Sequence, residues 1–137
     1  MQYIYQKPHQ SIWLATGLLL LLSVYGIGRV LDVQLHDTYA IFDTAHLGLG
    51  FAALLATTGL IYWLLRDRRL VGWMTAVHVV TTVAAFVAIV LACLLSNPET
   101  VIAIPPGAAL VLAVLVFYLS QGLFVTNALV GLLRGAR

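Results

Sequence analysis

Long apolar runs separated by short polar connections dominate the chain. Four such runs, covering 12–30, 43–65, 71–95 and 105–133, contain no charged residue except near their ends. Apolar runs of about 20 residues are typical of membrane-spanning helices. Short connections make consecutive helices antiparallel neighbours. The pattern therefore predicts an all-α, integral membrane four-helix bundle that takes up 1–137 as a single membrane domain.

The composition agrees with a membrane protein. Hydrophobic residues make up 62% of the chain and charged residues 9%, whereas a water-soluble domain usually has about 25% charged residues. The single Cys93 excludes an intrachain disulfide. With a net charge of +2 and no basic stripe, the sequence gives no indication of a nucleic-acid partner.

Basic residues gather at places that a four-span topology puts on one side of the membrane. They are Lys7 before the first run, Arg66, Arg68 and Arg69 between the second and third, and Arg134 and Arg137 after the fourth. The positive-inside rule makes this side cytoplasmic, together with both termini. Only Arg29 departs from the pattern, and Asp32 is close enough in the sequence to offset its charge.

One face of the second run combines polar residues with small ones. Asp43, His46, Gly50, Ala53 and Thr57 recur at helical spacing. Small residues beside a histidine leave space for a flat ring, and a carboxylate three residues earlier can fix the tautomer of an imidazole that binds metal. The alternative is purely structural, because small residues also let membrane helices approach closely.

The third and fourth runs carry a second set of polar residues. Thr75, His78, Thr82 and Ala85 share one face of the third run. An ionisable group this deep in a span indicates function by default, but the threonines can equally satisfy His78 as a neutral packing residue. In the fourth run, Ser120 and Asn127 share a face with Gln121 beside it, and this pattern favours polar contacts between helices.

Depth excludes a single heme held by both histidines of one chain. Twenty residues separate His46 from Arg66, or about 30 Å of helix. Nine residues separate His78 from Arg69, or about 14 Å. The two imidazoles are therefore expected at different levels of the bilayer, so a second axial ligand would come from another subunit or be absent.

The stretch LDVQLHDTY at 31–39 resembles the segment before the tenth helix of subunit I of the heme-copper oxidases. In that family the segment lies at the outer membrane face, and the helix that follows carries H-x-H, one histidine for each of two hemes. Counted from Tyr39 without gaps, these positions fall on Thr44 and His46. The resemblance therefore implies that the low-spin heme ligand is kept at His46 and that the high-spin ligand is missing.

Two weaker likenesses extend the resemblance. GLIYW at 59–63 is similar to the end of the same family helix, and LFVTN and LLRG within 120–135 are similar to the end of the family's last helix. The chain thus resembles the last four of twelve helices. The segments that carry the copper-site histidines and the opposite low-spin ligand have no counterpart here, so one chain cannot house oxygen reduction, and enzymatic activity is left open.

The resemblance implies cofactors and their ligands. We expect a heme, of b or a type, with His46 as axial ligand, Asp43 in support, Gly50 leaving space and His78 as a weaker candidate. The family's outer-face magnesium site matches His36 and Asp37, which implies a divalent cation there, with Tyr39 in the same polar cluster. The alternative for this segment is a turn in which Asp37 and Thr38 cap the second helix.

The family fold also implies an assembly. Its twelve helices have pseudo-threefold symmetry, so a homotrimer of four-helix chains, favoured over a dimer, would imitate the whole subunit. We expect a multi-pass protein of the inner (plasma) membrane of a prokaryote that binds heme and transfers electrons. The rival hypothesis is a cofactor-free accessory or assembly subunit that packs against other respiratory-chain subunits. A small transporter has little support because the intramembrane charges are few.

Overall fold

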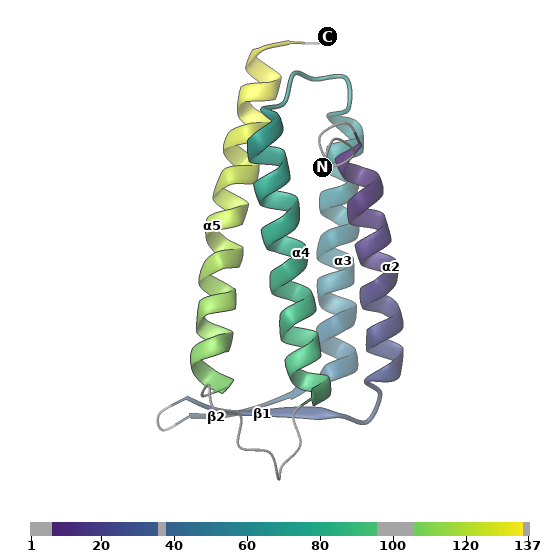
Figure 1. The fold of residues 1–137 in the computed structure, drawn as a ribbon, viewed down its shortest axis with the longest axis vertical. Helices are drawn as coiled ribbons and strands as arrows, with labels where there is room; N and C mark the ends of the chain where they lie inside the picture. Colours follow the sequence, from purple (N-terminus) through teal and green to yellow (C-terminus); the bar gives the residue numbers. More distant parts are fainter. Residues whose placement is uncertain (1–6, 36–37, 96–105, 136–137) are drawn as a thin grey trace.

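The computed structural model describes residues 7–35, 38–95 and 106–135. Four helices stand side by side in it: α2 (Pro8–Tyr25), α3 (Thr44–Leu64), α4 (Gly72–Leu95) and α5 (Pro106–Leu133) (Figure 1). Two antiparallel strands, β1 (Val30–Leu35) and β2 (Thr38–Asp43), lie across one end of the helices. The predicted four-helix fold is confirmed, and the β-hairpin is an addition that the sequence pattern did not predict.

Three helices are long and apolar enough to cross a membrane, by length and composition, among the described residues. They are Thr44–Leu64, Gly72–Leu91 and Val111–Leu133. The 18 residues of α2 begin with Pro8, His9, Gln10 and Ser11, which make its first turn polar. Three of the four predicted spans are therefore supported, and α2 runs beside them in the bundle.

The first helix differs from the predicted span by more than a turn at its start. We expected 12–30, whereas α2 begins at Pro8 and ends at Tyr25. Proline suits the first helical position because its missing N–H has no partner there in any case. At the other end, Gly26 follows the last helical residue, and Gly28 adopts a φ of +79° in the turn after it. The other helices begin and end within one residue of the predicted spans.

Glycines bring α2 and α3 into close contact. A Cβ at Gly48 would lie 1.9 Å from Oγ of Ser23, and one at Gly59 would lie 2.5 Å from Nε1 of Trp13. Neither distance is possible without movement of a neighbour, so the two helices approach through positions that only glycine fills. Close approach over small residues is the usual way in which membrane helices gain packing energy.

Aromatic rings fill the space between α3, α4 and α5. Phe51 stacks on Phe86 with ring centroids 4.3 Å apart and planes 4° apart, and Phe86 contacts Phe117 at 5.1 Å. Aliphatic side chains of α2, α3 and α4 complete the same core, among them Leu19, Leu55 and Val90. Most of the rest of α5 is exposed on the outside of the bundle.

Asp43 caps α3 at the hairpin. Its carboxylate accepts a hydrogen bond from the backbone N–H of His46 at 3.0 Å. Thr38 lies in β2 and not at a helix start, so the predicted capping by Thr38 is wrong. The cap falls at Asp43 because the chain stays extended up to this residue. His36 and Asp37 lie outside the described residues, and their cation site stays a prediction.

Arg29 contacts the end of α4. Its guanidinium donates to the backbone carbonyl of Leu94 and lies over the ring of Tyr25, 5.3 Å from the centroid. Helix C-termini attract cations because their last carbonyls have no intrahelical donor. The contact ties the loop after α2 to α4.

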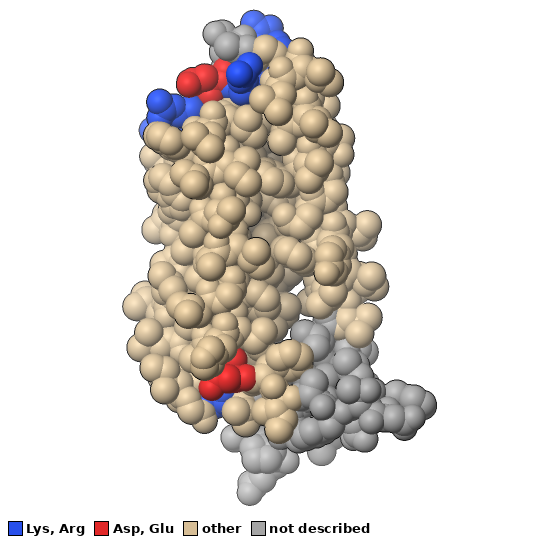
Figure 2. Space-filling view, turned by 180° about the vertical axis from the view of Figure 1, so that it is seen from behind, with Lys and Arg blue, Asp and Glu red and all other residues tan. Residues whose placement is uncertain are grey.

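The described charged side chains gather at the two ends of the bundle, with a broad uncharged band between them (Figure 2). We call these the arginine end, with Lys7, Arg66, Asp67, Arg68, Arg69 and Arg134, and the hairpin end, with Arg29 and Asp43. An uncharged band over the full helix length is the surface that a bilayer requires.

Candidate functional site

The polar face of α3 points out of the bundle. The His46 side chain is 87% exposed, Ala53 and Thr57 are exposed, and a Cβ at Gly50 would meet nothing within 4 Å. The opposite face of α3 contains the buried residues, namely Thr44, Gly48, Ala52, Leu55, Gly59 and Tyr62. The sequence predicted a shared face, and the structure places that face outside the chain's own core.

His46 and Asp43 form a close pair. Nδ1 of His46 lies 3.0 Å from Oδ1 of Asp43, the same oxygen that accepts the backbone N–H of His46. A carboxylate at Nδ1 favours the tautomer with the proton on Nδ1. Nε2 then carries a lone pair that is free to bind a metal on the outside of the helix bundle.

The charge of Asp43 is stabilised by its position. Its pKa lies below the ordinary value of 3.8, first because of the hydrogen bond from the backbone N–H of His46 and then because of the imidazole. A lowered pKa in the folded protein means that the carboxylate is ionised at neutral pH. The stability it contributes is complete above about pH 3.8 and is lost as the pH falls through the lowered pKa.

An apolar groove lies beside His46, between α2 and α3. Its volume is about 200 Å³, and its lining residues are Leu20, Ser23, Val24, Ile27, Ala45, His46 and Leu49. Pockets that enclose a small molecule usually have about 300–1,000 Å³. The groove is therefore too small to enclose such a molecule by itself.

Among the described residues, His46 is the one histidine with a free ring nitrogen on this face. His78 is buried in the core of the bundle, and His9 lies in the first turn of α2 at the opposite end. Across the described ranges, no three His, Cys, Asp or Glu side chains come together to hold a metal ion.

Thr44 faces the inside of the chain. It is fully buried, and its Cγ2 would lie 2.7 Å from a Cβ at Gly26. Two residues along a helix turn a side chain by about 200°, so Thr44 and His46 point in nearly opposite directions. The position that matches the missing high-spin ligand is thus filled by packing of α2 on α3.

His78 lies in a polar cluster between α3, α4 and α5. Its Nδ1 is 3.0 Å from the hydroxyl of Tyr62, and its ring stacks on Phe124 with centroids 4.8 Å apart. Nε2 has no hydrogen-bond partner among the described residues, although the amide of Gln121 lies near the imidazole. These contacts favour the packing interpretation of His78 over a ligand role.

Hydrogen bonds from α5 complete this cluster, as the sequence predicted for Ser120 and Asn127. Ser120 donates to the carbonyl of His78 at 3.2 Å and bonds Thr82 at 2.9 Å. Asn127 donates to Thr75 at 2.8 Å and accepts from the backbone N–H of Val71 at 2.7 Å. All four side chains are buried, so they fix the position of α5 against α4.

Sequence reasoning missed Tyr62 as the partner of His78 and the α2 side of the groove. Helical periodicity relates residues of one helix only, so it cannot pair a tyrosine on one helix with a histidine on another. Only the packing of the helices brings these two residues together. The groove residues of α2 are ordinary leucine and valine, which carry no signal of their own.

No protein-family model, curated protein or solved structure matched the chain in the three comparisons made. The likeness to heme-copper oxidases therefore rests on the residue stretches quoted above and remains a resemblance.

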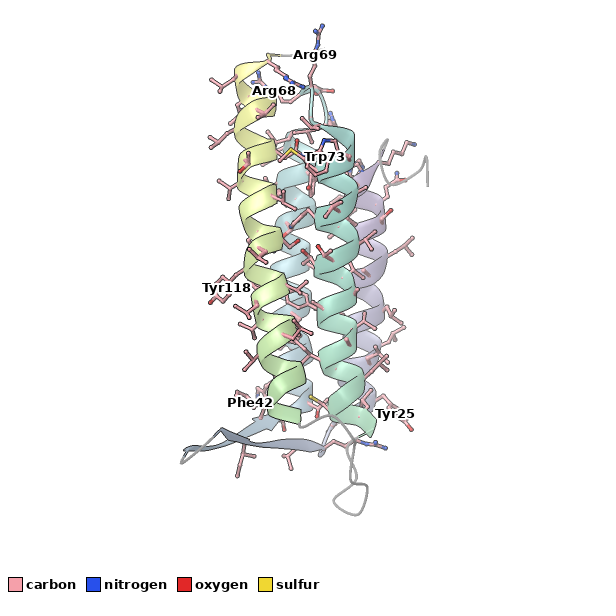
Figure 3. All side chains as sticks on the ribbon, turned by 60° about the vertical axis from the view of Figure 1, so that its left-hand side comes forward. Tyr25, Phe42, Arg68, Arg69, Trp73 and Tyr118 are labelled. Atoms are coloured by element: carbon pink, nitrogen blue, oxygen red, sulfur yellow. The ribbon has the colours of Figure 1, made fainter. Side chains whose placement is uncertain are left out.

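We expect Tyr62→Phe to lower the stability of the bundle by about 1–3 kcal/mol, because it leaves a second nitrogen of a buried imidazole without a partner. Thermal unfolding in detergent would measure the change. Tyr118→Phe is the matched control, because Tyr118 is 68% exposed and points away from α5 into the surroundings (Figure 3). Equal stabilities for the two variants would contradict the role of the Tyr62–His78 contact.

Proposed function

We propose that the protein is a membrane heme-binding electron-transfer protein related to subunit I of the heme-copper oxidases. The proposal rests on the hydrogen bonding and the exposure of the His46 imidazole. Its Nδ1 is held by Asp43, and its Nε2 is exposed beside an apolar groove on the outer surface. Metal-ligating histidines usually have this arrangement, with the second nitrogen bonded to a carboxylate or carbonyl.

The chain contributes binding and orientation, and a bound heme supplies one-electron transfer. His46 would hold the heme iron, and Asp43 would keep the imidazole in the required tautomer and orientation. The apolar side chains of α2 and α3 that line the groove exclude water from one side of the ring. Gly50, with open space at its Cα, lets the ring lie close to the backbone of α3.

The site requires a second protein surface, and we propose that another copy of the chain provides it. The described part of one chain offers one free ligand and a groove of about 200 Å³, so the remaining ligand and cover would come from outside. The resemblance to a pseudo-threefold subunit favours a trimer over a dimer. In this assembly α2 is a fourth span, both termini are cytoplasmic, and the membrane is the inner membrane of a prokaryote.

A cofactor-free accessory or assembly subunit is the second candidate. The exposed face of Gly50, Ala53 and Thr57 favours it, because such a face can pack directly on a helix of another respiratory-chain subunit. The two candidates differ in whether the protein carries heme. The cation proposed at His36 and Asp37 is independent of both.

If His46 binds heme, the purified protein is coloured and its Soret band shifts on reduction with dithionite. We expect His46→Ala to remove most of the bound heme, because the free energy of iron ligation is lost with the imidazole. Absorbance of the protein purified from heme-replete cells measures this.

His78→Asn is the control for the heme experiment. It changes a buried imidazole whose Nδ1 bonds Tyr62, so heme content should stay near that of the unaltered protein. Colourless unaltered protein would remove the heme proposal and leave the accessory subunit as the better candidate.

Gly50→Leu should break the assembly without disturbing the fold, because a bulky side chain there meets nothing in its own chain but would keep a neighbouring helix away. Native mass spectrometry in mild detergent would report the oligomeric state. Gly17→Leu is the matched control, since a Cβ at Gly17, on α2, also meets nothing within 4 Å. If Gly50→Leu assembles like Gly17→Leu, this face of α3 does not join copies of the chain.

A further inference from the structure

The arginine end has a large excess of positive charge. Its described residues include five basic side chains, those of Lys7, Arg66, Arg68, Arg69 and Arg134, and one acid, Asp67. Arg66 lies 3.6 Å from that acid and also stacks over Trp63. Within the described part of the chain, Arg68, Arg69 and Arg134 have no ion-pair partner, so their charge is available to a ligand.

The packing of α5 brings two of these arginines to the same place. A Cβ at Gly131 would lie 2.6 Å from Cδ2 of Leu70 and 3.7 Å from Cβ of Arg68. The turn before α4 therefore lies directly on α5. Arg134 follows Gly131 by three residues, which puts it on the same side of α5 about one turn further on. Arg69 extends from the same turn as Arg68 (Figure 3).

Apolar surface begins immediately below these charges. The side chain of Leu133, next to Arg134, is 88% exposed, and the indoles of Trp63 and Trp73 are exposed at the same end. Trp73 lies just below the arginines in Figure 3. Tryptophan is enriched at the level where lipid headgroups meet acyl chains. A ligand here would thus contact arginine with one part and an apolar surface with the other.

We propose that Arg68, Arg69 and Arg134 bind the headgroup of an anionic phospholipid. Guanidinium groups form bidentate hydrogen bonds with phosphate oxygens, and basic pockets between the ends of membrane helices are typical sites for such headgroups. Free phosphate offers the same oxygens but has no acyl chains. We choose the lipid because the charges border directly on exposed apolar side chains.

Native mass spectrometry of the detergent-purified protein with added phosphatidylglycerol or phosphatidylcholine tests the proposal. We expect phosphatidylglycerol to be retained at lower concentration. Each arginine near an anionic lipid contributes roughly a fivefold factor in affinity, so Arg68→Gln with Arg134→Gln should weaken retention by about 25-fold. Arg68→Lys with Arg134→Lys keeps the charge and should keep the preference. Arg29→Gln, at the hairpin end, is the control: it removes a positive charge and the contact with the Leu94 carbonyl, but should leave phosphatidylglycerol retention unchanged.

Equal retention of the two lipids, or full retention by the double glutamine variant, would overturn the proposal. If millimolar inorganic phosphate displaces the lipid completely, the site belongs to a free anion instead. Should the double variant fail to fold, each single variant must still lose about fivefold. The heme spectrum is read from the same samples and does not depend on these arginines, so the two proposals fail separately.

Discussion

The close contact between α2 and α3 fixes the rotation of α3 about its own axis, and so decides which of its faces is buried. Gly48 lies against Ser23, and Gly59 lies against Trp13, at distances that leave no room for a Cβ. Because these two glycines are eleven residues apart, close to three helical turns, the contact fixes the rotation of α3 along most of its length. This rotation turns His46 out of the core, so that its imidazole lies on the outer surface beside the groove between α2 and α3.

The structure separates two histidines that look alike in the sequence. Both lie within apolar runs beside small or hydroxyl residues. His78 is enclosed by Tyr62, Phe124 and the hydroxyls of α4 and α5, where a neutral imidazole serves as a hydrogen-bonding and stacking group. His46 is bonded to Asp43 by one nitrogen and exposes the other. The difference lies in which face each helix buries, and it makes His46 the better candidate for the heme ligand that we propose.

Several parts of this arrangement could be predicted from the sequence. Apolar periodicity gave α3, α4 and α5 within one residue at each end, and the spacing of Asp43 and His46 indicated their contact. The start of α2 was missed because His9 and Gln10 interrupt the apolar pattern before Ile12. The hairpin was missed because the two residues between its strands, at 36–37, do not include the Gly or Asn-Gly that marks a tight turn.

Periodicity alone could not predict the outward direction of the His46 face, because it identifies residues that share a face but not the partner of that face; only the resemblance to the oxidase subunit implied a centre shared between copies. The glycines do not show which face is buried either. Gly48 and Gly50 are the same residue type two positions apart, yet only Gly48 contacts α2. Which glycine is internal follows from the rotation of α3 alone.

Cysteine cross-linking tests the central claim, that the His46 face of α3 joins copies of the chain. With the buried Cys93 replaced by serine, Gly50→Cys is oxidised in native membranes with copper phenanthroline, and the product is read on a non-reducing gel. We expect a covalent dimer for Gly50→Cys and monomer for Gly17→Cys, which is equally open but lies on α2. Monomer for both would contradict it.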